Sequence, residues 1–218
     1  MSAQGAAAAP GWRYPAALLA AFVAVFVALG VAPRYRQDWL LENMLVLAAV
    51  PVLVATRHRL RFSDFAYTCI FVFFCLHEIG AHYTYSEVPY DAWFQAAFGT
   101  SLDGLLGFER NHFDRLVHFL YGLLITPAAI ELFAHYGRYP RVWAALFPLF
   151  FMISHSVVYE LIEWGAALVF GGDLGQAYLG TQGDIWDAQK DMALAALGTT
   201  ITVTGYALAG RLPKRGHP

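Results

Sequence analysis

Charged residues are scarce in this sequence. Asp, Glu, Lys and Arg together make up 14% of its 218 residues, whereas ordinary soluble domains carry about 25%. Hydrophobic residues reach 58% and the mean hydropathy is +0.47, which is more apolar than a soluble core of this size requires. The composition therefore predicts an all-α integral membrane protein. The length leaves room for one compact helix bundle and for no sizeable domain outside the membrane.

The sequence also lacks an excess of basic residues, and it contains only two cysteines. The formal net charge is −2, and no basic patch of the kind that binds nucleic acid is present, so we expect no nucleic-acid partner. Cys69 and Cys75 lie in the same predicted helix, about 240° apart around its axis. We interpret them as small apolar side chains rather than as a disulfide.

Six apolar segments are long enough to cross a bilayer, which takes roughly 17–25 helical residues. They are Tyr14–Val31, Trp39–Ala55, Phe65–His82, Asp114–Ala134, Val142–Trp164 and Asp187–Ala209. No clear cleavage site follows the first segment, so we expect it to be retained rather than removed as a signal peptide. Residues 1–218 are predicted to form a single membrane domain of about six spans. The aromatic connection 83–113 is expected to fold over one end of it.

The placement of Lys and Arg predicts the orientation, because cytoplasmic loops of membrane proteins are enriched in these residues. Nine of the 14 basic residues lie at the N-terminus, between the second and third spans, between the fourth and fifth, or in the C-terminal tail. The opposite side holds the other five, which are Arg34, Arg36, Arg110, Arg115 and Lys190. The tails 1–13 and 210–218 are therefore predicted to be cytoplasmic, and the connection 83–113 extracytoplasmic.

Ionisable side chains within the predicted spans lie mostly at one depth. At 1.5 Å of helix rise per residue, most fall roughly 5–15 Å from the midplane on the predicted extracytoplasmic side. They are Glu42, His77, Glu78, His82, Asp114, His118, His155, Glu160, Glu163, Asp187 and Asp191. His155 is nearest the middle, and Glu131 is an exception near the inner end of its span. A charge at this depth costs at least about 2.5–3.5 kcal/mol, so we expect the group to face the bundle interior and to be paired or bound to a cation.

Helical spacing places pairs of these residues on shared faces. Three pairs lie four positions apart and are candidate metal ligands; they are Glu78 and His82, Asp114 and His118, and Asp187 and Asp191. Small residues nearby would allow helices to approach closely; they are Gly122, Gly165, Ala188, Ala195 and Gly198. Mixed carboxylate and imidazole ligands suit zinc, manganese or iron, and an all-oxygen subset suits magnesium or calcium. The sequence therefore favours a divalent metal ion as cofactor.

Structural roles compete with metal binding at some of these positions. An aspartate near a helix N-terminus is favoured by the helix dipole, which accounts for Asp114. Capping accounts for Asp184 or Asp187. Neither role explains His118 or Asp191, each one turn deeper. In HEIGAH the histidines are five positions apart rather than four, so the motif is not the H-E-x-x-H of zinc proteases.

The segment SHSVVYELIEW supplies the candidate acid–base groups. His155, Ser156, Tyr159, Glu160 and Glu163 share one helix side, and the side chains opposite are apolar. Neither glutamate has a basic residue nearby on its own helix, so each requires a cation, a proton or an arginine from elsewhere. Arg115 is the expected partner. Glu160, Glu163, His155 and Arg115 are therefore the candidate catalytic residues, with core hydrogen bonding as the alternative for His155.

Four stretches carry a resemblance to a known family. They are HEIGAHYTYSEVPYDAW, RNHFDRLVHFLYG, SHSVVYELIEW and GDIWDAQKDMALAALG. As a set they resemble the signature blocks of the YjdF-like family of bacterial inner-membrane proteins, over nearly the whole chain after the first span. FDRLVHFLYGLL and GDIWDAQKDMALAALGTTI also resemble, more distantly, the VanZ-like proteins, which are linked to glycopeptide antibiotic resistance. The resemblance implies a multi-pass inner-membrane location and a helix bundle, and it assigns no activity.

Three functions follow from the polar layer. The first is a metal-dependent hydrolase or transferase that acts on a lipid or envelope precursor, with membrane lipids as its surroundings. The second is a proton- or ion-coupled transporter, because acid and histidine chains inside membranes also mark ion paths. It requires a polar route through the inner half, where the sequence offers Glu131 and a few hydroxyls. The third is a non-catalytic envelope factor whose polar layer stabilises the bundle.

Overall fold

The computed structural model describes residues 11–172, 175 and 179–213. Its α-helices are α1 (Arg13–Gly30), α2 (Arg36–Thr56), α3 (Asp64–Tyr83), α4 (Tyr90–Phe98), α5 (Leu102–Leu106), α6 (Phe113–Tyr136), α7 (Arg141–Phe170) and α9 (Asp187–Leu208). One turn of 3-10 helix, η1 (Tyr85–Glu87), follows α3. The described ranges contain no strand, and the predicted all-α class is confirmed.

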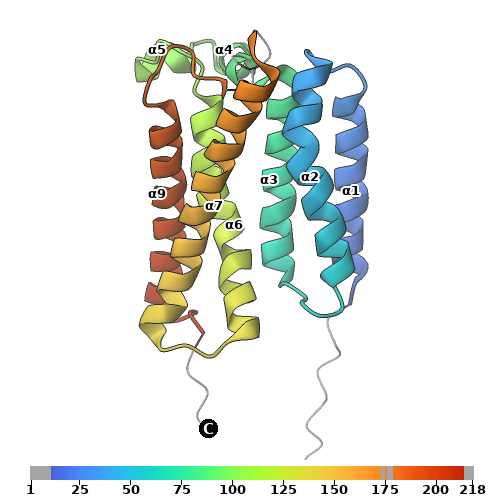
Figure 1. Cartoon of the computed structure of the whole chain (residues 1–218), viewed down its shortest axis with the longest axis vertical. Helices are drawn as coiled ribbons and strands as arrows, with labels where there is room; N and C mark the ends of the chain where they lie inside the picture. The colour runs from blue at the N-terminus through green and yellow to red at the C-terminus, as the bar shows by residue number, and fades with distance from the viewer. Residues whose placement is uncertain (1–10, 173–174, 176–178, 214–218) are drawn as a thin grey trace, which may run out of the picture.

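Five of the six predicted spans are helices long and apolar enough to cross a membrane, namely α1, α2, α3, α6 and α7. The sixth predicted span coincides with α9, which is 22 residues long and runs beside α6 and α7 (Figure 1). α9 does not reach the same apolarity, because acidic residues open it and four threonines lie along it. The helix-bundle prediction is confirmed, with α9 as its most polar long member.

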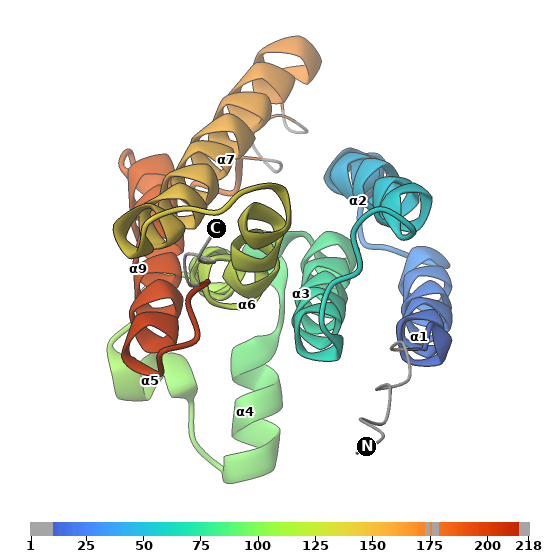
Figure 2. The ribbon, with the colours of Figure 1, turned by 90° about the horizontal axis from the view of Figure 1, so that it is seen from below.

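The bundle is built from two groups of three helices that meet along α3 and α6. α3 packs against α1 and α2, and α6 packs against α7 and α9. Figure 2 shows the two groups side by side, with α2 and α7 on the same face of the molecule and apart from each other. The α6–α9 contact lies within the second group, whereas α2 and α7 belong to different groups.

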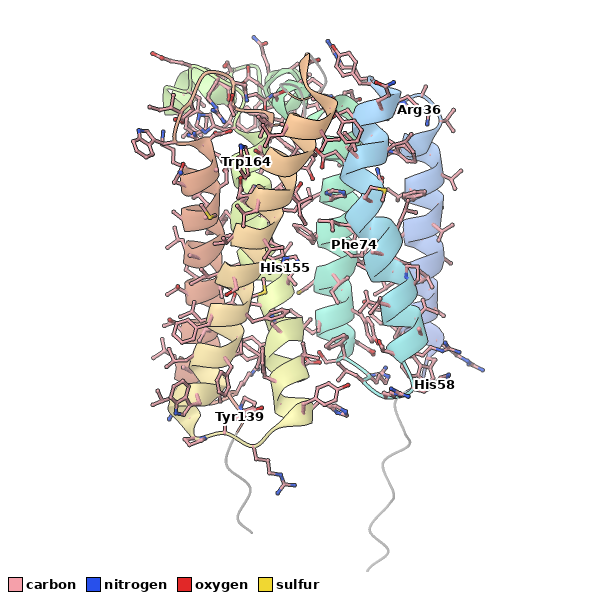
Figure 3. The ribbon with its side chains drawn as sticks, viewed as in Figure 1. Arg36, His58, Phe74, Tyr139, His155 and Trp164 are labelled. Atoms are coloured by element: carbon pink, nitrogen blue, oxygen red, sulfur yellow. The ribbon has the colours of Figure 1, made fainter. Side chains whose placement is uncertain are left out.

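The connection between α3 and α6 covers one end of the bundle, as predicted. η1, α4 and α5 lie across this end (Figure 1), which we call the capped end. α1 begins and α9 ends at the opposite end, and Figure 3 shows His58 and Tyr139 there and Arg36 near the capped end. The predicted division of the connections between two sides is thus observed. The compartment that each side faces stays a prediction, and Lys214 and Arg215 lie outside the described residues.

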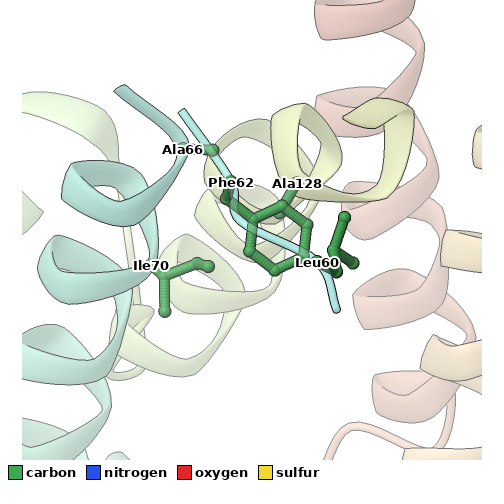
Figure 4. Close-up of a cluster of buried hydrophobic side chains, with 5 residues drawn as sticks. All are labelled: Leu60, Phe62, Ala66, Ile70 and Ala128. Atoms are coloured by element: carbon green, nitrogen blue, oxygen red, sulfur yellow. The ribbon is translucent and has the colours of Figure 1, made fainter. Parts of the chain in front are cut away.

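A small apolar core fixes the α2–α3 connection to α6 at the end opposite the cap. Leu60 and Phe62 of this connection are buried with three helix residues, as Figure 4 shows; those are Ala66, Ile70 and Ala128. Glu131 of α6 accepts hydrogen bonds from the Ser63 backbone N–H at 2.7 Å and from its hydroxyl at 2.5 Å. Ser63 in turn caps α3 by accepting from the Ala66 N–H. Glu131, the exception in depth, is therefore bonded to the N-cap residue of α3.

Candidate metal centre in the bundle interior

The close crossing of α6 and α9 depends on two glycines. A Cβ atom added to Gly122 would lie 2.1 Å from the Ala195 carbonyl oxygen, and one added to Gly198 would lie 2.2 Å from the Phe119 carbonyl oxygen. The backbones therefore touch, as small residues permit in membrane helices. An added Cβ at Gly165 meets none of the described residues within 4 Å. The predicted close approach is therefore observed at Gly122, Ala195 and Gly198 and not at Gly165.

This crossing brings three predicted metal ligands together. Asp114 and His118 lie on α6 and Asp191 lies on α9, and one ligand atom from each falls within 4.8 Å of the others. His118 is one helical turn from Gly122, and Asp191 is one turn from Ala195, so both project toward the same gap just beyond the backbone contact. Nε2 of His118 lies 3.5 Å from Asp114 Oδ1.

α7 adds two glutamates beside these ligands. Glu160 Oε1 lies 3.7 Å from His118 Nε2, and Glu163 is buried within electrostatic range of Asp114 and Glu160. The opposite side of this part of α7 is exposed, as predicted; its residues are Val157, Val158, Leu161, Ile162 and Trp164. We call Asp114, His118, Glu160, Glu163 and Asp191 the acid–histidine cluster.

Arg115 does not pair with Glu160 or Glu163, so that prediction is wrong. Its guanidinium contacts Asp184 and also lies 3.2 Å from Asp187 Oδ1. Arg110, which no sequence pattern singled out, donates to the same Asp187 oxygen at 2.6 Å. Two arginines thus form ion pairs with Asp187 next to the cluster. Asp187 is not a member of the triad of candidate metal ligands.

Asp184 is held ionised at the start of α9. Lys190 donates to its carboxylate at 2.6 Å, and the Trp186 N–H donates at 3.0 Å. The hydrogen bond from Lys190, with the Trp186 N–H and Arg115, lowers the pKa of Asp184 well below its ordinary value. These residues form one ion-pair network that links the start of α6 to the start of α9. Its members are Arg110, Arg115, Asp184, Asp187 and Lys190.

The other predicted ligand pair lies elsewhere. His82 Nδ1 is 2.7 Å from the Leu29 carbonyl oxygen at the end of α1. Glu78 is fully buried on α3 beside Asn43 of α2. The structure therefore does not bring Glu78 and His82 into the triad of Asp114, His118 and Asp191.

A second group of buried polar residues joins α2 to α3, and sequence reasoning missed most of it. Asp38 accepts a 2.5 Å hydrogen bond from Thr84, and His77 Nδ1 is 2.5 Å from the Tyr85 hydroxyl. Burial raises the pKa of Tyr85 well above its ordinary value, so the phenol stays protonated. Asp38 precedes Glu42 by four positions, and this i, i+4 spacing was the signal that could have identified it.

Glu42 connects the two polar groups. Its Oε2 accepts a hydrogen bond from Tyr159 of α7 at 3.3 Å, and Glu42 is within electrostatic range of Asp114 and Glu78. The carboxylates on α2, α3, α6, α7 and α9 thus form one layer near the capped end, as their depth in the sequence predicted.

A cavity of about 490 Å³ lies beside this layer, and residues of α2, α3, α6 and α7 supply most of its lining. Asp114, His118, His77 and Tyr85 line its end near the cap. His155 lines it at mid-height of the bundle (Figure 3) and bonds the Tyr121 hydroxyl at 2.8 Å. The volume falls within the range of about 300–1,000 Å³ that is typical of small-molecule sites.

A bundle of apolar helices with buried carboxylates and a histidine defines a polytopic membrane protein with an internal polar site. The chain belongs to the family described as predicted membrane protein (DUF2238), whose profile matches residues 14–211. It is 35% identical over 181 residues to inner membrane protein YjdF of Escherichia coli (strain K12), an alignment that covers 82% of each chain. No solved structure matches the chain.

These comparisons confirm the YjdF-like resemblance and support a multi-pass inner-membrane location. The resemblance to VanZ-like proteins stays a prediction.

Proposed function

We propose that this protein is a divalent-metal-dependent membrane hydrolase or transferase acting on a lipid or envelope precursor. The observation that carries the proposal is the convergence of Asp114, His118 and Asp191 within 4.8 Å, between two helices of a membrane bundle. A triad of two carboxylates and one imidazole suits zinc, manganese or iron. Magnesium would draw on the carboxylates alone.

The charge balance of the acid–histidine cluster supports a bound cation. Asp114, Glu160 and Asp191 lie close to His118, and Glu163 adds a fourth carboxylate to the cluster. The neighbouring arginines bond to Asp184 and Asp187. Asp191 Oδ1 and Glu160 Oε1 are buried and have no hydrogen-bond partner among the residues that the structure describes. Uncompensated buried charge costs several kcal/mol or more, so a divalent ion would offset both the mutual repulsion and the missing bonds.

The residues around the triad suit an acid–base reaction. A metal ion in such a site polarises a substrate oxygen or activates water. Glu160 lies next to His118, and Glu163 is within electrostatic range of Glu160 and Asp114, so either glutamate would accept or return a proton near the metal. His155 lines the cavity and is positioned to contact a bound substrate. Arg115 would act indirectly, by holding Asp187 and the start of α9 in place.

The lining of the cavity favours this function over transport. A transporter requires a polar route that continues toward the end opposite the cap. The part of the lining that extends that way is apolar; it includes Ile125, Ala128, Ala129, Leu132, Leu53 and Phe62. Glu131, the carboxylate deepest in that half, bonds to Ser63.

Metal content tests the proposal. The protein is purified in detergent, dialysed against a mixture of zinc, manganese, iron and magnesium salts, and analysed by elemental mass spectrometry. We expect about one divalent ion per chain in the wild type. Asp191→Asn and His118→Ala remove one ligand each, and loss of one ligand is expected to reduce occupancy sharply.

Two residues at the opposite end of the bundle provide matched controls. Asp64→Asn and His135→Ala remove an exposed carboxylate and an exposed imidazole away from the triad, and both should retain the metal. Equal metal content in all five proteins, or none in the wild type, would contradict the proposal.

A further inference from the structure

The cavity has two chemically different parts. Its cap-proximal end carries ionisable side chains, including Asp114 and His118. Beyond His155 and Tyr121 at mid-height, the lining consists of aliphatic and phenyl groups. A ligand that matches both parts is an amphiphile, with a polar head at the acid–histidine cluster and an apolar chain along α2, α3 and α6. A small hydrophilic ligand would leave most of the apolar surface unmatched.

The side of the cavity between α2 and α7 is open. Each of these helices packs on its own neighbours, α2 on α3 and α7 on α6 and α9, and Figure 2 shows α2 and α7 apart. Cavity-lining side chains on both are exposed, at 59% for Val52 and 41% for Phe151. His155 is also exposed while lining the cavity. The exposed lining side chains on α2 and α7 therefore place this side of the cavity next to the protein surface.

This opening lies at the height of the membrane-crossing parts of α2 and α7, so hydrocarbon and not water surrounds it. Near the cap, Tyr85 and Val88 of the α3–α6 connection are buried against Phe113 and Val117. This apolar cluster covers the cavity on the capped side. The route that remains is sideways, between α2 and α7.

We propose that a phosphate-bearing membrane lipid enters sideways between α2 and α7 and places one hydrocarbon chain in the cavity. Its phosphate would lie at the acid–histidine cluster. The position of the phosphate rests on the proposed function, whereas the position of the hydrocarbon chain rests on the cavity alone. Phosphate is the head chemistry that fits, because a divalent ion held by carboxylates is commonly completed by substrate phosphate oxygens. The substrate class is therefore a lipid phosphate taken directly from the bilayer.

Photo-crosslinking in vesicles tests the inference. The full chain is reconstituted in phosphatidylglycerol vesicles that contain a phosphatidylglycerol probe with a diazirine in its acyl chain, and the labelled peptides are mapped by mass spectrometry. Bilayer lipid labels exposed side chains in any membrane protein. The informative positions are Val117 and Ala129, which are buried but line the cavity. We expect both to be labelled.

A bulky side chain at the opening provides the matched comparison. Ala49 of α2 lines the cavity, and Ala24 of α1 is exposed and does not. Ala49→Trp should abolish labelling at Val117 and Ala129, whereas Ala24→Trp should leave it unchanged. Thermal unfolding of both variants shows whether they fold. Labelling confined to exposed positions in the wild type, or buried labelling that persists in folded Ala49→Trp, would overturn the lateral entry.

A second probe separates the head from the chain. A diacylglycerol with the same diazirine chain lacks phosphate, and we expect it to label Val117 and Ala129 less than the phosphatidylglycerol probe does. Equal labelling by both would overturn the role of the phosphate. Asp191→Asn should lower the difference between the two probes. Labelling of Val117 and Ala129 in a protein that binds no metal would contradict the metal proposal but support the binding of a lipid chain in the cavity. The experiment therefore distinguishes failure of one proposal from failure of the other.

Discussion

Substitution of Gly122 by alanine tests the α6–α9 crossing directly. The added Cβ would lie 2.1 Å from the Ala195 carbonyl oxygen and 2.7 Å from the Thr199 nitrogen, whereas non-bonded atoms prefer roughly 3.5–4.0 Å. Both neighbours are helix backbone and cannot rotate away, so α6 and α9 must separate by about 1 Å or more. Overpacking of a well-packed interior costs about 1–3 kcal/mol.

The same displacement should disable the candidate metal centre. His118 and Asp191 lie one turn from this contact on opposite helices, and metal–ligand distances tolerate only about 0.2 Å of error. Gly122→Ala should therefore lower the unfolding temperature in detergent and release the bound metal. Gly165→Ala is the control, because its added Cβ would meet none of the described residues within 4 Å. The unfolding temperature and the metal content of this variant should stay near those of the wild type. A Gly122→Ala protein that unfolds like the wild type would refute the backbone contact.

Two further changes test the ends of the bundle. The pKa of Asp184 is lowered, chiefly by its hydrogen bond from Lys190. The ionised carboxylate therefore stabilises the fold at pH values above the ordinary aspartate pKa. This stabilisation is lost as the pH falls below about 4. The unfolding temperature of the wild type should therefore drop more steeply between pH 6 and pH 3 than that of Asp184→Asn; parallel curves would refute this. Ser63→Ala removes the N-cap of α3 and a bond to Glu131. It should cost about 1 kcal/mol in chemical denaturation, and Thr200→Ala, which loses only a bond within its own helix, should cost less.

The sequence predicted the helices and the layer of carboxylates because both depend on local spacing. A sufficiently long apolar segment predicts a membrane span whatever the rest of the fold. A four-residue interval places Asp114 and His118 on one face of any α-helix. Gly122 and Gly198 added the information that two helices touch. These signals placed Asp191 and His118 in one polar layer as candidate ligands, and the structure brings the two together with Asp114.

The arginine partners could not be predicted in the same way. Arg110 precedes α6 in an irregular segment, and no periodicity indicates where its guanidinium points. Arg115 is one position from Asp114, so it projects from a different side of α6 and meets Asp184 and Asp187 rather than the glutamates of α7. The buried polar residues that join α2 to α3 could not be fully predicted either, because their contacts join residues far apart in the sequence. Asp38 binds Thr84, which lies 46 positions later at the end of α3.

The cavity follows from unequal packing across the bundle. Glycines hold α6 and α9 in backbone contact, whereas α2 presents larger aliphatic side chains toward α7 and joins it through the hydrogen bond between Tyr159 and Glu42. Rigid metal ligands require the first kind of contact, because their positions must be fixed to a fraction of an ångström. Entry of a lipid between α2 and α7 would use the second kind, because neither helix carries Asp114, His118 or Asp191. The two requirements are therefore met by different helix pairs, and substitutions on α2 should alter lipid access while leaving the metal ligands in place.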